Sequence, residues 1–178
     1  IDTLEAAMAD GRVTGGGAVS FDAAGPGSLR LNWRGVETGD VLRAAGVKLP
    51  LRLASRLDGR VQASWTARRA GALAFDLSNS AAAVGRPGAL GLGGQTSLKV
   101  GDGAWRFEHA GTAGSTSVVC NTRGQLDAGS LAKSPLDGTL RLAAPDVGRA
   151  IAELSSAGLP LGQASSVDLG GEAAIDVR

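Results

Sequence analysis

Few residues in this sequence could perform nucleophilic chemistry. Residues 130–133 read Ser-Leu-Ala-Lys and match the Ser-x-x-Lys of penicillin-binding enzymes, in which the lysine helps to deprotonate the serine. Neither Lys-Thr-Gly nor Ser-Asp-Asn accompanies the match, so we interpret it as accidental. Cys120 and His109 are each the only residue of their type and could form a nucleophile and base. The apolar alternation around Cys120 instead favours a small, buried thiol.

The sequence also lacks the residue patterns that usually bind metals or phosphate. A single histidine cannot build a metal site with carboxylates that show no recognisable spacing. The glycine-rich stretches 15–17 and 91–94 could approach phosphate oxygens, but no Gly-Lys-Ser/Thr follows and no strand-loop-helix unit surrounds them. Solvated turns and helix starts explain most of the acidic residues Asp22, Glu37, Asp40, Asp58, Asp76, Glu108, Asp137 and Asp146. We therefore expect no enzyme, no metal and no cofactor.

The composition indicates a folded chain with few bulky core residues. Its 178 residues fit one domain and include 28 Gly, three Phe, three Trp and no Tyr. Apolar residues make up 43% and charged residues 20%, which argues against disorder. The net charge is +1 and charges of both signs are interspersed, so we expect no nucleic-acid partner.

The sequence shows no membrane-span or signal-peptide pattern. No apolar run is long enough for a membrane span, and no basic-then-apolar signal peptide opens the chain. Because the sequence starts at Ile1 without a methionine, we expect it to be a piece of a longer protein, with any targeting or anchoring segment outside it.

Alternation of apolar and polar residues predicts strand after strand. Leu29, Leu31 and Trp33 alternate with polar neighbours, which gives the strand one apolar face. The same pattern covers Arg60 to Trp65 and Leu73 to Leu77. Further candidate strands are Val13 to Phe21, Leu49 to Leu53, Thr96 to Val100, Ala104 to Glu108, Thr116 to Asn121, Gly138 to Ala143 and Glu172 to Val177.

Glycine and proline predict the turns between these strands. Glycine readily takes a positive φ, and proline fixes φ for the turn. The predicted turns are Ala24 to Gly27, Leu57 to Gly59, Arg69 to Gly71, Gly85 to Gly88, Gly101 to Gly103 and Leu136 to Gly138.

Three stretches have helical spacing instead. Ile1 to Met8 fits the end of a helix, and Gly39 to Ala45 fits a short helix that stops at Gly46. Pro145 suits a first helical position, and Gly158 can close the helix that follows. That helix carries an apolar stripe of Val147, Ile151 and Leu154.

Two parts of the chain resemble each other. Leu29-Arg30-Leu31 returns as Leu140-Arg141-Leu142, and Leu49-Pro50-Leu51 returns as Leu159-Pro160-Leu161, at shifts of 111 and 110 residues. The order strand, short helix, Leu-Pro-Leu, turn, strand therefore predicts an imperfect repeat over 29–65 and 140–178. We expect residues 1–178 to form a single repetitive β segment, an elongated curled sheet of groove-like or solenoid-like form with two or three short helices.

The sequence resembles the AsmA-like family, and within it the TamB-like proteins, in which β-strands ending in glycine turns are interrupted by short helices. The residues that carry the resemblance are 10–17, which read Asp-Gly-Arg-Val-Thr-Gly-Gly-Gly, the strand and helix over 29–46, and Ser55 to Val61. The resemblance is strongest over 1–77 and 136–178, and weaker between them. It carries no invariant functional residue onto this chain.

The resemblance implies a periplasmic protein, tethered to the inner membrane by a segment outside this chain, that guides phospholipids between the inner and outer membranes. The implied partners are phospholipid acyl chains and an outer-membrane protein reached through the rest of the chain, with no small-molecule substrate. An open curled sheet could cover its apolar face with lipid chains. The residues expected to line such a groove are Leu29, Leu31, Trp33, Val61, Ala63, Trp65, Leu73, Phe75 and Leu77.

Two readings of these residues stay open. They could line a lipid groove, or they could pack the closed core of a sandwich or solenoid. The second reading fits a structural β-solenoid from an adhesin or autotransporter, which would have no lipid role.

Overall fold

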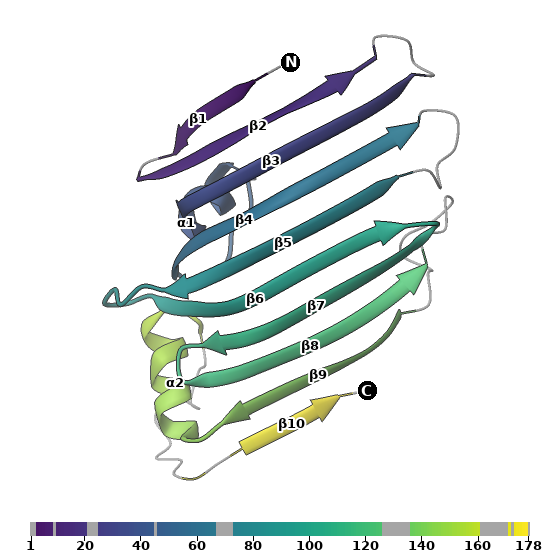
Figure 1. The fold of residues 1–178 in the computed structure, drawn as a ribbon. Helices are drawn as coiled ribbons and strands as arrows, with labels where there is room; N and C mark the ends of the chain where they lie inside the picture. The colour runs from purple at the N-terminus through teal and green to yellow at the C-terminus, as the bar shows by residue number, and fades with distance from the viewer. Residues whose placement is uncertain are drawn as a thin grey trace.

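The chain folds into one open β-sheet. The computed structural model describes residues 3–8, 10–20, 25–44, 46–66, 73–125, 136–160, 171 and 173–177. In these residues ten strands lie side by side in chain order, each antiparallel to the next (Figure 1). The predicted mainly β, elongated sheet is thus confirmed. The strands are β1 (Leu4–Met8), β2 (Gly11–Val19), β3 (Pro26–Glu37), β4 (Leu53–Thr66), β5 (Ala74–Ala83), β6 (Leu90–Gly101), β7 (Ala104–Ala113), β8 (Thr116–Gln125), β9 (Leu136–Ala144) and β10 (Ala173–Val177).

Local turns explain why neighbouring strands in sequence are neighbours in the sheet. Gly101 pairs with Ala104, and the two residues between them, Asp102 and Gly103, have φ angles of 52° and 73°. Two positive φ angles define the tight hairpin turn that matches the twist of antiparallel strands. The turn predicted over Gly101 to Gly103 is therefore confirmed.

Two helices interrupt the described strands, α1 (Thr38–Ala44) and α2 (Val147–Ser156). Both predicted short helices are thus found, and neither has the length and apolar character needed to cross a membrane. The helix end predicted over Ile1 to Met8 is wrong, because Leu4–Met8 is strand β1 and pairs with β2. Leu4 and Met8 are four residues apart, which suits one face of a helix but equally one face of a strand, and the pairing with β2 decides between them.

The boundaries of α2 are set by its caps. Asp146 is the N-cap, and its side chain accepts a hydrogen bond of 2.9 Å from the Arg149 backbone N–H. Pro145 therefore precedes the cap and is not the first helical residue, as the sequence suggested. At the other end Gly158 has a φ of 103°, and its N–H and that of Leu159 donate back to the carbonyls of Ser155 and Leu154.

Two turn predictions and one strand prediction are wrong. The glycines of Leu57 to Gly59 and Leu136 to Gly138 lie inside β4 and β9, where cross-strand pairing continues through them. At both places pairing with the neighbouring strands overrides the local propensity for a turn. Leu49 to Leu53 is not a strand, because β4 begins only at Leu53 and residues 49–52 have no register partner in a neighbouring strand. The turn predicted over Arg69 to Gly71 and the Ser-x-x-Lys match at 130–133 lie outside the described residues.

The order strand, helix, strand occurs in both segments of the predicted repeat. Helix α1 connects β3 to β4, and α2 lies in the connection from β9 to β10, with antiparallel strands paired in each case. Among the residues that the structure describes, the best-buried apolar side chains lie in or beside α2, or at the ends of β3, β4 and β6 nearest the helices, except for one in mid-strand (Figure 1). These side chains are Val36, Ala54, Val61, Leu90, Ala150 and Ala157, and Val61 is the mid-strand exception.

Helix α2 is anchored to the sheet by Glu153. Its carboxylate accepts hydrogen bonds from the backbone N–H of Ser115 at 2.7 Å, from the Ser115 hydroxyl at 2.9 Å and from Arg149 Nε at 2.9 Å. Ser115 sits in the turn between β7 and β8. Partial burial by itself raises the pKa of Glu153, but the hydrogen bonds from Ser115 and Arg149 outweigh it, so the pKa lies below its usual value.

Glu153→Gln should therefore reduce the acid sensitivity of the fold. A carboxyl group whose pKa is lowered by folding stabilises the protein above its unfolded pKa, and this stabilisation is lost as the pH falls through the folded pKa. We expect the variant to lose about 1–2 kcal/mol at pH 7 and a smaller amount near pH 3, measured by urea unfolding. As a control, Glu108→Gln removes a carboxylate that pairs with Arg106 at 3.4 Å on the exposed sheet surface. An equal loss at both pH values for Glu153→Gln would contradict this role.

Candidate functional site

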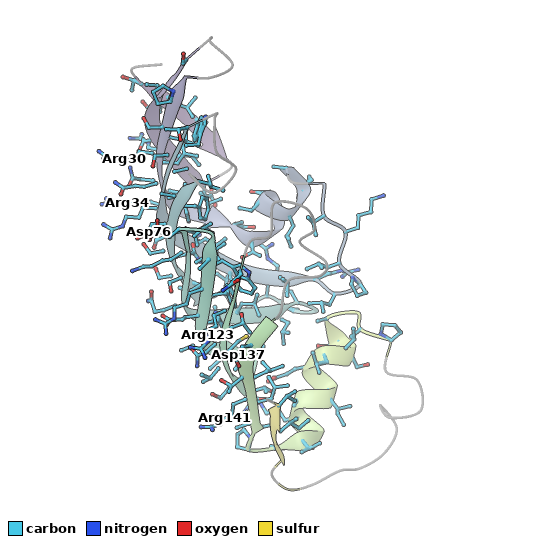
Figure 2. All side chains as sticks on the ribbon, turned by 90° about the vertical axis from the view of Figure 1, so that its right-hand side faces the viewer. Arg30, Arg34, Asp76, Arg123, Asp137 and Arg141 are labelled. Atoms are coloured by element: carbon cyan, nitrogen blue, oxygen red, sulfur yellow. The ribbon has the colours of Figure 1, made fainter. Side chains whose placement is uncertain are left out.

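The two faces of the sheet differ in chemistry. Figure 2 shows Arg30, Arg34 and Asp76 on the side opposite the two helices, together with Arg123, Asp137 and Arg141. We call this side the charged face. Successive side chains along a strand point to opposite sides of the sheet. The residues that alternate with these charged ones therefore point to the side where the helices lie, which we call the apolar face.

The structure places the predicted groove residues on the apolar face. In register, Leu31, Val61 and Leu77 form one row across β3, β4 and β5. Leu29, Ala63 and Phe75 form the adjacent row. Trp33 and Trp65 lie on the same face of β3 and β4, and Leu73 immediately precedes β5. That these residues line a groove stays a prediction.

Both rows continue through strands that the sequence reasoning did not include. Leu98 and Phe107 extend the first row on β6 and β7. Val100 and Trp105 extend the second. The alternation of apolar and polar residues that predicted strands at Thr96 to Val100 and Ala104 to Glu108 could have identified these four residues. They were not included because the family resemblance was weak there. We call the two rows together the apolar stripe: Leu29, Leu31, Val61, Ala63, Phe75, Leu77, Leu98, Val100, Trp105 and Phe107.

The stripe is only partly covered. Leu29 keeps 38% of its surface exposed, and Leu73 beside the stripe keeps 40%. Val61, at 8%, is the single buried member of the stripe, and the eight members other than Leu29 and Val61 are half-buried. The helices lie towards the other ends of the strands (Figure 1). Across the five strands β3 to β7, at about 4.8 Å per strand, the stripe is roughly 19 Å long.

Each tryptophan lies over a glycine of the neighbouring strand. Trp33 faces Gly59 and Trp65 faces Gly27, while Trp105 faces Gly124. A Cβ atom on any of these glycines would come within 2.3–2.6 Å of the paired indole ring. The missing side chains therefore let the rings lie across the strands, which pins the register.

A row of polar side chains also crosses the apolar face. Asn79, Thr96, His109 and Cys120 are successive register partners on β5, β6, β7 and β8. We call them the polar row. Trp33 Nε1 donates to Asn79 Oδ1 at 2.8 Å, and Thr96 Oγ1 lies 2.9 Å from His109 Nδ1. The sequence singled out His109 and Cys120 but not Asn79 or Thr96, because only the register brings the four together.

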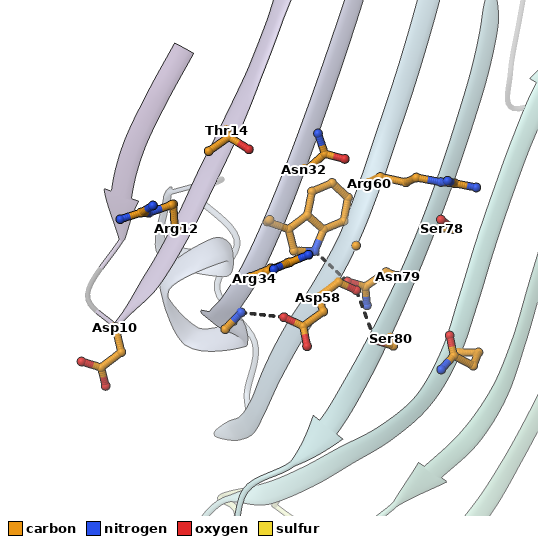
Figure 3. A pocket seen from close by; sticks show the side chains of 14 residues that line it. Asp10, Arg12, Thr14, Asn32, Arg34, Asp58, Arg60, Ser78, Asn79 and Ser80 are labelled. Atoms are coloured by element: carbon orange, nitrogen blue, oxygen red, sulfur yellow. Dashed lines mark hydrogen bonds between the residues drawn. The ribbon is translucent and has the colours of Figure 1, made fainter. Parts of the chain in front are cut away.

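The charged face carries a shallow hollow around Asn32 (Figure 3). Arg12 and Arg34 are register partners there, and Asn32 is paired with Arg60. Below them the β3 strand bulges at Gly35, which has a φ of 63° and donates its N–H to Asp58 Oδ1 at 2.7 Å. Mixed cations, amides and hydroxyls of this kind fit a hydrated outer surface.

The acidic residues noted in the sequence are dispersed, and among the described residues they form no cluster that could hold a metal ion. Glu37 pairs with Arg86 at 3.2 Å, and Asp137 accepts from Arg123 Nε at 2.8 Å. Asp58 supports the bulge and Asp146 caps α2. Asp22 lies outside the described residues.

Fold and surface together define a class: an open antiparallel sheet of consecutive hairpins with one charged face and one incompletely covered apolar face. Comparison with protein-family models, curated proteins and solved structures gave no match.

Proposed function

We propose that this chain is a periplasmic segment of an AsmA/TamB-like protein that carries phospholipid acyl chains along its apolar face, without a chemical step. The observation that supports this most is the apolar stripe, which crosses five strands while remaining half-exposed. Contiguous apolar surface of this kind is costly to leave in water, at about 25 cal/mol per Å².

An acyl chain suits the stripe chemically. It is linear and apolar and needs no hydrogen-bonding partner, and the stripe consists of aliphatic and aromatic side chains. An extended protein segment would also bring backbone N–H and C=O groups that must be satisfied. The strands that carry the stripe are already paired on both sides, which favours a ligand without a backbone.

The alternative is a structural role in an adhesin or autotransporter. A β-solenoid would close its strands around a filled interior, whereas the described strands form an open sheet. The structural role then requires a protein cover for the stripe, and the experiment below separates it from lipid transport.

Photo-crosslinking from opposite faces tests the proposal. A photoreactive residue at Leu31 would lie in the stripe, and one at Asn32 would lie on the charged face one residue away. With the chain expressed in the periplasm of a Gram-negative bacterium, we expect phospholipid adducts from position 31 and at least tenfold fewer from position 32. Protein adducts alone from position 31, or equal lipid adducts from both, would refute the proposal.

A further inference from the structure

The polar row runs beside the apolar stripe on the same face. Asn79, Thr96 and His109 each lie two residues along their strands from a stripe residue, namely Leu77, Leu98 and Phe107. Side chains two residues apart point to the same side of a strand. A ligand lying on the stripe would therefore have polar groups along one of its flanks.

Two hydrogen bonds among the described residues orient the side chains of the polar row. Asn79 Oδ1 accepts from Trp33, which fixes the orientation of the amide and leaves its two Nδ2 hydrogens directed elsewhere. When the Thr96 hydroxyl donates to His109 Nδ1, the imidazole proton resides on Nε2. In that tautomer Asn79 and His109 both offer N–H groups on the apolar face.

Small residues lie beside these donors. The next row across β5, β6 and β7 consists of Ala81, Gly94 and Gly111, which carry little or no side chain. Gly94 and Gly111 approach closely, since a Cβ on Gly111 would come within 2.8 Å of the Gly94 Cα. Large side chains are thus excluded next to the polar row on that side.

We propose that the polar row binds the polar end of an amphiphile whose acyl chain lies on the apolar stripe, through oxygen acceptors of a carboxylate, phosphate or ester. This inference rests on the proposed function and specifies its ligand. The N–H groups of Asn79 and His109 require acceptors, and a purely hydrocarbon ligand would leave them unpaired. The stripe supplies the chain-binding part and the polar row fixes the position of the headgroup.

Three ligands with matched acyl chains test the inference: palmitate, dipalmitoyl phosphatidylglycerol and pentadecane. Binding to the whole chain is measured by equilibrium dialysis for the wild type, Asn79→Leu and His109→Leu. We expect each variant to bind palmitate, phosphatidylglycerol or both about tenfold more weakly, while pentadecane binding is unchanged. The ligand with the larger loss identifies whether carboxylate or phosphate ester is the preferred acceptor.

Controls separate a binding role from a structural one. Thr96→Val is nearly isosteric and removes the hydroxyl that orients His109, so it should also weaken polar-ligand binding. Thr112→Val makes the same change on the charged face of β7, the strand that carries His109, and should have no effect. Urea unfolding shows that each variant is folded before binding is compared.

The outcomes distinguish this inference from the proposed function. Equal losses for all three ligands, or no loss for any, overturn the polar row as a headgroup site while the stripe remains a chain-binding surface. Failure of the wild type to bind any of the three ligands overturns the lipid-binding function and the headgroup site together.

Discussion

Gly59→Ala is expected to destabilise the sheet by about 1–3 kcal/mol, although alanine usually stabilises a position where glycine has an ordinary φ. A Cβ at residue 59 would lie 2.5 Å from both the Ser78 carbonyl oxygen and the Trp33 ring. The ring can rotate away, but the backbone of β5 can move only by disturbing its pairing with β4. Urea unfolding followed by far-UV circular dichroism measures the effect.

Gly101→Ala is the matched control for this change. No heavy atom within 4 Å would contact a Cβ at residue 101, at the end of β6. We expect its stability to remain within about 0.5 kcal/mol of the wild type. A Gly59→Ala protein as stable as Gly101→Ala would show that the Trp33 and Gly59 pair does not constrain the sheet.

Phe107→Gln is expected to weaken acyl-chain binding about 30-fold. Phe107 lies in the apolar stripe on β7, so a glutamine there places an amide where the chain would lie. Losing the apolar contact of a phenylalanine corresponds to about 2 kcal/mol, which is roughly a 30-fold change in dissociation constant. Equilibrium dialysis with palmitate measures the change.

Arg106→Gln provides the control from the opposite face of the same strand. Arg106 pairs with Glu108 at 3.4 Å, and the side chain is 65% exposed, so its removal should change stability very little. Binding should equal that of the wild type. If the two variants bind palmitate equally well, the stripe is not the lipid-binding surface and the proposed function fails.

Alternation predicted which residues share a face, because the period of a strand is two. Leu29, Leu31 and Trp33 could be assigned to one face from their spacing alone, and the structure places them there. Spacing could not decide between helix and strand over Leu4–Met8, where two apolar residues fit both periods. Pairing with β2 makes this segment a strand.

The register between strands could not be predicted from the sequence. Asn79, Thr96, His109 and Cys120 appear in four separate segments, and only the lengths of the hairpins bring them into one row. Aspartate followed by glycine at 58 and 59 suggested a turn. In the sheet Asp58 instead supports the bulge at Gly35, and Gly59 accommodates Trp33.

The tryptophans give this protein a built-in optical reporter. The chain has three Trp and no Tyr, and all three indoles lie over glycines on the apolar face. Its near-ultraviolet absorption and its fluorescence therefore arise almost entirely from that face. Trp105 belongs to the apolar stripe, while Trp33 is hydrogen-bonded to the polar row. Occupation by a lipid would displace water from these rings and shift their emission to the blue, so filling of the surface can be followed without a label.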